Sequence, residues 1–103
     1  MIAVRYEADT GLLRCTGHAG YAEAGGDIVC AAVSGMLYTL LTNLPGDCVE
    51  TWEPGNLLLR CDTAQERAAA RFCLRGLAVI AEEYPQCVAL HGCGDILAEN
   101  LIL

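Results

Sequence analysis

The chain has 103 residues, 54% of them apolar, and carries thirteen carboxylates against six arginines and no lysine, for a net charge of −7. This length is that of one domain, which we place at residues 1–103. An acidic surface repels nucleic-acid phosphates and attracts basic peptides, so direct nucleic-acid binding is not expected. The high apolar content predicts self-association that hides part of the surface.

The first predicted element is a β-hairpin. Residues 2–7 alternate apolar and polar side chains, turn residues stand at 9–11, and an extended run resumes at 12–17. A loop of residues 18–26 follows.

A helix is predicted next, because Asp27 is a good N-cap and apolar residues recur at helical spacing until Pro45. Residues 28–44 carry no charge, which raises the possibility of a membrane span. Seventeen residues is the short limit for a span, and the acidic flanks provide no arginine to set an orientation. We therefore predict a buried helix of a soluble protein and no membrane association.

The second half of the chain repeats the hairpin-helix order. Residues 47–62 predict a hairpin that turns at 54–56, and the capping-box pattern at 63–66 opens a helix that ends near Tyr84. Residues 87–91 form the last predicted strand, and no element is assigned to 92–103. The inner face of the second helix is predicted to include Ala69, Phe72, Cys73, Leu77 and Ile80. The ββαββαβ order indicates an α+β fold, a mixed sheet with two helices packed on it.

Seven cysteines are scattered along the chain, and none forms a C-x-x-C pair. Secreted disulfide frameworks use even numbers of cysteines, and structural zinc sites use closely spaced pairs. The pattern, with no basic-then-apolar leader, predicts a protein of the reducing cytoplasm whose thiols are mostly small core residues. Neither a metal nor another cofactor is expected.

Cys30 differs from the other cysteines by its place at the start of the first predicted helix. With Asp27 as N-cap, Cys30 is the third helical residue, where unpaired amides and the helix dipole favour a thiolate. His18 is close enough in the chain to fold back over it as a general base. Asp27, Cys30 and Ser34 share one stripe of the helix.

Each supporting residue also has a simpler explanation. Asp27 caps the helix, orients His18, or does both, while Ser34 donates a hydrogen bond near the sulfur or only allows close packing. First-turn amides, that of Cys30 included, are candidate oxyanion donors. A lone cysteine in an apolar helix is more often a packing residue than a nucleophile.

The blocks GHA at 17–19 and DIVCAAVS at 27–34 resemble the signature of the ribosomal-processing cysteine proteases, the Prp family. The resemblance implies that His18 and Cys30, twelve residues apart, are the catalytic pair and that Asp27 and Ser34 support them. It covers nearly the whole chain and implies the same element order.

The resemblance also implies a function. Members of that family are bacterial endopeptidases, needed for ribosome assembly, that remove a short N-terminal extension from a large-subunit ribosomal protein next to aromatic residues. They are homodimers in which the loop between histidine and cysteine covers the site. In this chain the lid would contain Ala19, Gly20, Tyr21, Gly25 and Gly26.

Three alternatives remain open from the residues themselves. A thiol-based redox sensor would need a resolving cysteine near Cys30, and Cys15 and Cys48 are the nearest in sequence. A non-catalytic ribosome-associated binding module would not need the thiol. A metal site built from His18, His91 and cysteines lacks paired ligand spacing.

Overall fold

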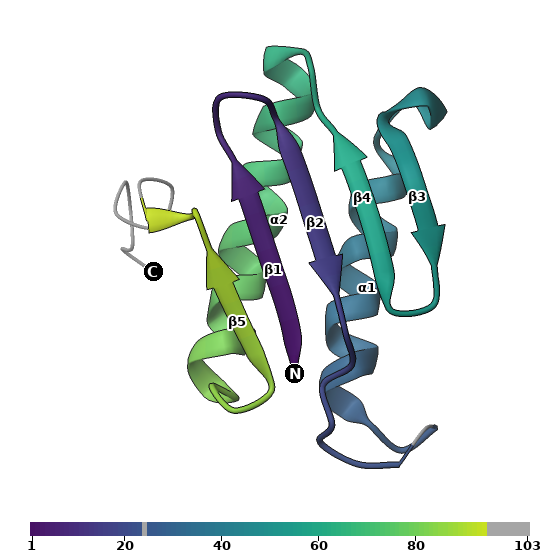
Figure 1. The fold of residues 1–103 in the computed structure, drawn as a ribbon, viewed down its shortest axis with the longest axis vertical. Coiled ribbons are helices and arrows are strands. Elements are labelled where there is room, and N and C mark those ends of the chain that lie inside the picture. Colours follow the sequence, from purple (N-terminus) through teal and green to yellow (C-terminus); the bar gives the residue numbers. More distant parts are fainter. Residues whose placement is uncertain (24, 95–103) are drawn as a thin grey trace.

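The computed structural model describes residues 1–23 and 25–94. Both helices cover the same face of a five-stranded mixed sheet (Figure 1). This is the α+β architecture, in the ββαββαβ order, that the sequence predicts. The elements are β1 (Ile2–Glu7), β2 (Leu12–Thr16), α1 (Ile28–Thr42), a 3₁₀ turn η1 (Gly46–Cys48), β3 (Val49–Glu53), β4 (Asn56–Arg60), α2 (Ala64–Glu83) and β5 (Val88–His91).

The strand order, which the sequence pattern did not decide, is β3-β4-β2-β1-β5. Two antiparallel hairpins are joined side by side through β2 and β4, and β5 returns parallel to β1. The pairing of β2 with β4 places Thr16 opposite Asn56. The chain leaving β2 therefore lies beside the turn that connects β3 to β4, and this neighbourhood becomes one side of the site.

The core lies between the sheet and the two helices. Inward residues of the alternating strands meet apolar stripes of the helices, and Val4, Leu13, Leu59, Leu74 and Leu77 are fully buried. Burial of such side chains stabilises the fold by about 1.5–3 kcal/mol each.

The predicted inner face of α2 is wrong for one residue. Phe72 is 82% exposed, whereas Ala70, Cys73, Leu74 and Leu77 are buried. At about 100° per residue, a position two residues from both Ala70 and Leu74 lies on the opposite side of the helix. The hairpin turns, the capping box of α2 and the last strand are confirmed.

Helix α1 is less buried than the sequence predicts. Only Val29, Val33 and Leu40 are fully covered, while Ile28 and Tyr38 are more than half exposed. The helix rests on the sheet along one stripe, so its uncharged outer side faces solvent within the described part of the chain. Neither of the two described α-helices combines the length and the hydrophobicity that a membrane-spanning helix needs. Residues 95–103, in the tail left unassigned, lie outside the described residues.

Candidate active site

The loop that follows β2 and the beginning of α1 meet at one end of the sheet (Figure 1). His18 lies in that loop, Cys30 is the third residue of α1, and Ser34 follows one turn later. All three side chains line one cavity of about 450 Å³. The fold thus brings the histidine, cysteine and serine of the sequence hypothesis to a common space.

Asp27 is the N-cap of α1, as its position in the sequence predicts. Its Oδ1 accepts hydrogen bonds from the backbone amides of Val29, at 3.0 Å, and Cys30, at 2.9 Å. Amides at the start of a helix have no partner within the helix, so the cap stabilises the turn that holds Cys30. These bonds, that from Cys30 above all, lower the pKa of Asp27 below its usual value.

The second oxygen of Asp27 holds the loop. Oδ2 accepts hydrogen bonds from the amides of Tyr21, at 3.0 Å, and Ala22, at 3.3 Å. One carboxylate therefore joins the helix start to the segment before it. All four of these bonds are donated by backbone amides, so in this structure Asp27 caps the helix and holds the loop and is not the partner of His18.

The sulfur of Cys30 accepts a hydrogen bond from the backbone amide of Ala19, with a nitrogen–sulfur distance of 3.2 Å. Ala19 is only 3% exposed, so this donor is shielded from water. An N–H group aimed at sulfur stabilises negative charge there. The expectation that the amide of Cys30 serves an oxyanion is not met in this conformation, because Asp27 occupies that amide.

His18 is exposed, and its ring lies against the turn between β3 and β4. A Cβ atom placed on Gly55 would stand 3.0 Å from Nε2 of His18. The amide of Gly17 donates to the carbonyl of Gly55 at 2.9 Å, so the backbone before the histidine is attached to the same turn. Sequence reasoning identified Gly55 only as a turn residue, and nothing in the local pattern indicated its neighbour.

Two aromatic rings form a wall of the cavity that sequence reasoning did not assign to the site. Tyr38 of α1 and Trp52 of β3 have ring centroids 5.5 Å apart, and both are more than half exposed. Glu53 stands in the same lining and adds a carboxylate. The cavity thus offers a broad apolar and aromatic surface with one carboxylate in its lining.

The loop proposed as a lid has internal contacts of its own. Gly20 and Gly25 adopt left-handed backbone angles, with φ of 69° and 88°, which glycine reaches without strain. Gly26 donates from its amide to the carbonyl of Glu23 at 2.9 Å. The ring of Tyr21 meets Tyr84, at the end of α2, edge to face at 5.5 Å. The loop is therefore attached at both Asp27 and Tyr84.

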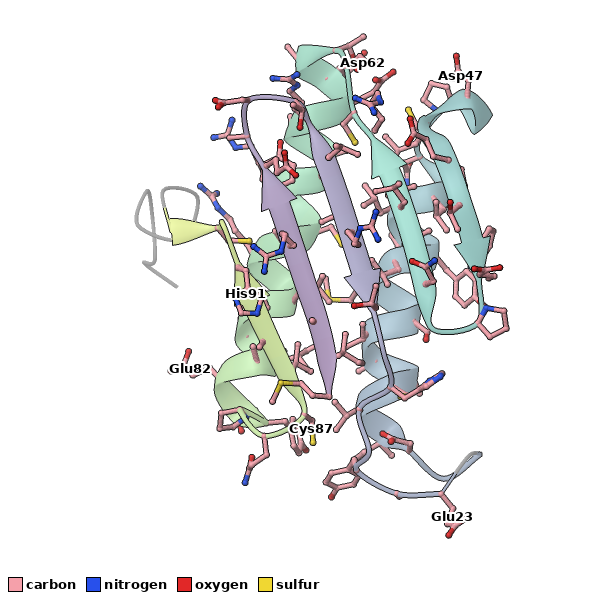
Figure 2. All side chains as sticks on the ribbon, in the orientation of Figure 1. Glu23, Asp47, Asp62, Glu82, Cys87 and His91 are labelled. Carbon is pink, nitrogen blue, oxygen red and sulfur yellow. The ribbon has the colours of Figure 1, made fainter. Side chains whose placement is uncertain are left out.

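The other six cysteines are buried, and all seven are free thiols. Cys15 lines the same cavity as Cys30, and burial above all raises its pKa to about 11. Cys48 lies in η1 directly after Asp47, at the end of the molecule away from the loop that carries Glu23 (Figure 2). Of the two cysteines nearest in sequence, only Cys15 shares the cavity of Cys30.

His91 stands apart from the site. It ends β5, where it pairs in register with Arg5 of β1, and it is exposed (Figure 2). It does not line the cavity of Cys30. Across residues 1–23 and 25–94, no three His, Cys, Asp or Glu side chains gather as metal ligands would.

Comparisons with known proteins show the family and the fold of the chain. The family model described as cysteine protease Prp matches residues 1–89. A structure of the essential ribosomal processing protease Prp from S. aureus, in complex with a covalently linked product peptide, is 22% identical with a TM-score of 0.71 and covers 87% of this chain and 95% of that one. No curated protein gives a match.

Two further solved structures share the fold. SMU.848 from Streptococcus mutans is 26% identical with a TM-score of 0.63, over 87% of this chain and 90% of that one. The S. aureus protease in complex with a substrate peptide is 20% identical with a TM-score of 0.65, over 87% and 96%. The family match spans residues 1–89, a range that contains every residue lining the cavity. Because it covers most of the sequence, the chain belongs to the Prp family of cysteine proteases.

Proposed function

We propose that this protease removes a short N-terminal extension from a basic protein of the large ribosomal subunit, with Cys30 as nucleophile and His18 as general base and acid. The observation that carries the proposal is that both side chains line one cavity, with a buried amide on the sulfur. The S. aureus structures of the same fold, which contain a substrate peptide and a covalently linked product peptide, support peptide binding by this chain.

In the acylation step, the thiolate of Cys30 attacks the scissile carbonyl carbon, and a carbon–sulfur bond forms as the carbonyl oxygen becomes an oxyanion. The amide of Ala19, already beside the sulfur, is a backbone donor for that charge. The carbon–nitrogen bond then breaks, and protonated His18 gives its proton to the leaving amine.

In the deacylation step, His18 takes a proton from water, and the resulting hydroxide attacks the thioester. The carbon–sulfur bond breaks, and the new carboxylic acid leaves and gives its proton to water. The thiolate of Cys30 and the protonated His18 are thereby restored. Asp27 supports both steps by holding the helix start and the loop together. Ser34 lines the cavity one helical turn from Cys30, within the space that the peptide would occupy.

The walls of the cavity fit the proposed substrate. Tyr38 and Trp52 provide ring surface for an aromatic side chain beside the cleaved bond, and such contacts stabilise binding by about 0.5–1.5 kcal/mol beyond burial alone. Glu53 and the net charge of −7 attract the proposed basic substrate protein.

We further propose a cytoplasmic homodimer. Ribosomal proteins are made in the cytoplasm, where seven free thiols stay reduced. A groove between the helices, lined by Ala31, Gly35 and Phe72 among others, contains no charged residue and suits a second copy of the chain. Light scattering of the wild type and of Phe72→Asp measures the oligomeric state. A dimeric wild type and a monomeric Phe72→Asp variant would support the groove as the interface, and a monomeric wild type would contradict it.

The decisive experiment is incubation with the full-length ribosomal protein that bears its extension. Wild type, Cys30→Ala and His91→Ala are compared, and mass spectrometry identifies the products. A single cut near an aromatic residue by the wild type and His91→Ala only is the expected result. An intact substrate with every form would contradict the proposed function.

A redox role remains a second candidate because Cys15 shares the cavity of Cys30. A peroxide would oxidise the Cys30 thiolate to a sulfenic acid, and the Cys15 thiol would displace water to give a disulfide. Mass spectrometry of peptides after mild peroxide treatment detects that bond. Its formation together with an absence of peptidase activity would favour the redox function.

A further inference from the structure

We infer that Gly55, in the turn between β3 and β4, is a positioning residue for His18: the missing side chain at Gly55 leaves the space in which the imidazole rests. This inference rests on the proposed function of His18 as the general base. Gly55 does not touch the reacting atoms, and its effect passes entirely through the histidine.

Turn geometry alone accounts for only part of the choice of glycine. Gly55 has a φ of 74°, a left-handed conformation that most residues avoid but that asparagine tolerates. A side chain here would also meet His18. An added Cβ would lie 3.0 Å from Nε2, 3.5 Å from Cε1 and 3.8 Å from Cδ2, so it faces three atoms of the ring.

The backbone of the histidine segment is attached to the same turn. The amide of Gly17 donates to the carbonyl of Gly55 at 2.9 Å, and Thr16 pairs with Asn56 in the neighbouring strands. These contacts fix where the residue before His18 leaves the sheet. The ring contact then restricts where the imidazole can turn, because an exposed side chain held only by its backbone samples several rotamers.

No other contact in the described residues performs this task. His18 makes no side-chain hydrogen bond there, and Asp27, the expected orienting carboxylate, accepts from four backbone amides instead. General bases are usually oriented by a hydrogen-bonded third group. In this protein, packing against a glycine replaces that hydrogen bond.

The kinetic test uses Gly55→Ala and Gly55→Asn. Both add a Cβ that stands 3.0 Å from Nε2, so the ring must move by a few tenths of an ångström. Asparagine accommodates the left-handed backbone and so limits the loss of stability. We expect kcat to fall roughly 10- to 100-fold in both variants, with KM changed less than about twofold. Gly46→Ala, a turn glycine with open space around its Cβ position, is the control and keeps the wild-type kcat.

A spectroscopic readout separates this inference from the proposed function. The chain has only two histidines, so an NMR spectrum of imidazole Cε1–H groups contains one signal from His18 and one from the distant His91. We expect both Gly55 variants to shift the His18 signal and leave the His91 signal in place.

The outcomes are decisive in either direction. Wild-type kcat and an unchanged His18 signal in Gly55→Asn would show that the glycine serves the turn alone, even if the wild type is a protease. Conversely, a wild type without peptidase activity would overturn the proposed function, while a shifted His18 signal would still demonstrate the ring contact.

Discussion

Cys30 and His18 line the same cavity, yet their surroundings are built from different contacts. The surroundings of Cys30 are held by hydrogen bonds. The amide of Cys30 donates to the helix cap Asp27 at 2.9 Å, and the amide of Ala19 donates to the sulfur of Cys30 at 3.2 Å. Around His18 the structure uses packing, with an exposed ring against the backbone of Gly55. The cysteine side is anchored to a helix, whereas the histidine side depends on a loop and a turn.

The difference has a physical origin in the two elements. A helix start has unpaired amides that demand an acceptor, so the same carboxylate that caps α1 also orders the residues around the thiol. A loop after a strand has no such demand, and its side chain must be held by whatever lies beside it. Changes on the cysteine side should therefore affect both stability and activity, and changes on the histidine side mainly activity.

The largest effect is expected from Cys30→Ala. Without the sulfur no acyl-enzyme forms, and kcat/KM should fall roughly 10⁴-fold or more. Cys73→Ala is the matched control, since Cys73 is a buried thiol of α2 whose pKa burial raises to about 11. It should lower the melting temperature and keep the activity. Cleavage by the Cys30→Ala variant would show that Cys30 is not the nucleophile.

The next effect is that of His18→Ala, which removes the base and the acid. We expect a loss of roughly 10²- to 10⁴-fold in kcat/KM with little change in melting temperature. His91→Ala should stay within about twofold of the wild type, because His91 lies outside the cavity. If the His91 variant lost more activity than the His18 variant, the assignment of the base would be wrong.

Substitutions of Asp27 separate the two roles of its carboxylate, which caps α1 and holds the loop before it. Asp27→Ala removes both the cap and the bonds to the loop, and should lower the melting temperature by roughly 4–8 °C and kcat/KM about tenfold. Asp27→Asn keeps the cap through its side-chain oxygen, but the NH₂ group that replaces Oδ2 cannot accept from the amides of Tyr21 and Ala22. It should therefore lose activity with little loss of stability. Wild-type activity in Asp27→Asn would mean that the bonds to the loop are unnecessary.

Acid should weaken the contacts at the starts of α1 and α2. Hydrogen bonds from backbone amides lower the pKa of Asp27, and the hydrogen bond that the capping-box amide of Thr63 donates does the same, above all other causes, for Glu66. A carboxylate with a depressed folded-state pKa contributes stability above its unfolded value of about 4, and this contribution is lost as pH falls through the folded value. Melting curves from pH 5 to pH 2 should drop less steeply for Asp27→Asn than for the wild type.

The smallest effect is expected in alkali. Burial above all raises the pKa of Cys15, Cys48 and Cys73 to about 11. A thiol with a raised folded-state pKa contributes stability below its unfolded value of about 8.5, and loses it as pH rises through the folded value. The melting temperature should therefore decline between about pH 9 and 11. A smaller decline in Cys73→Ala would confirm the cause, and an identical one would contradict it.

The sequence alone determined the elements and the cysteine side of the site. The signals that act between near neighbours could be predicted from the sequence. They are the alternation in residues 2–7, the N-cap Asp27, the helix breaker Pro45 and the capping box that begins at Thr63. The position of Cys30 in the first turn of α1 follows from the same local rules.

Only the tertiary structure decided the strand order, the exposed position of Phe72 and the cavity walls. The pairing of β2 with β4 brings Gly55 to His18 and Trp52 to Tyr38, and these contacts join residues 37 and 14 positions apart. Local propensities do not predict which strand of one hairpin pairs with which strand of the other. Any two antiparallel strands form the same pattern of backbone hydrogen bonds, so this pattern does not select the partner. Side-chain burial across the whole sheet makes that choice, and the histidine side of the site depends on it.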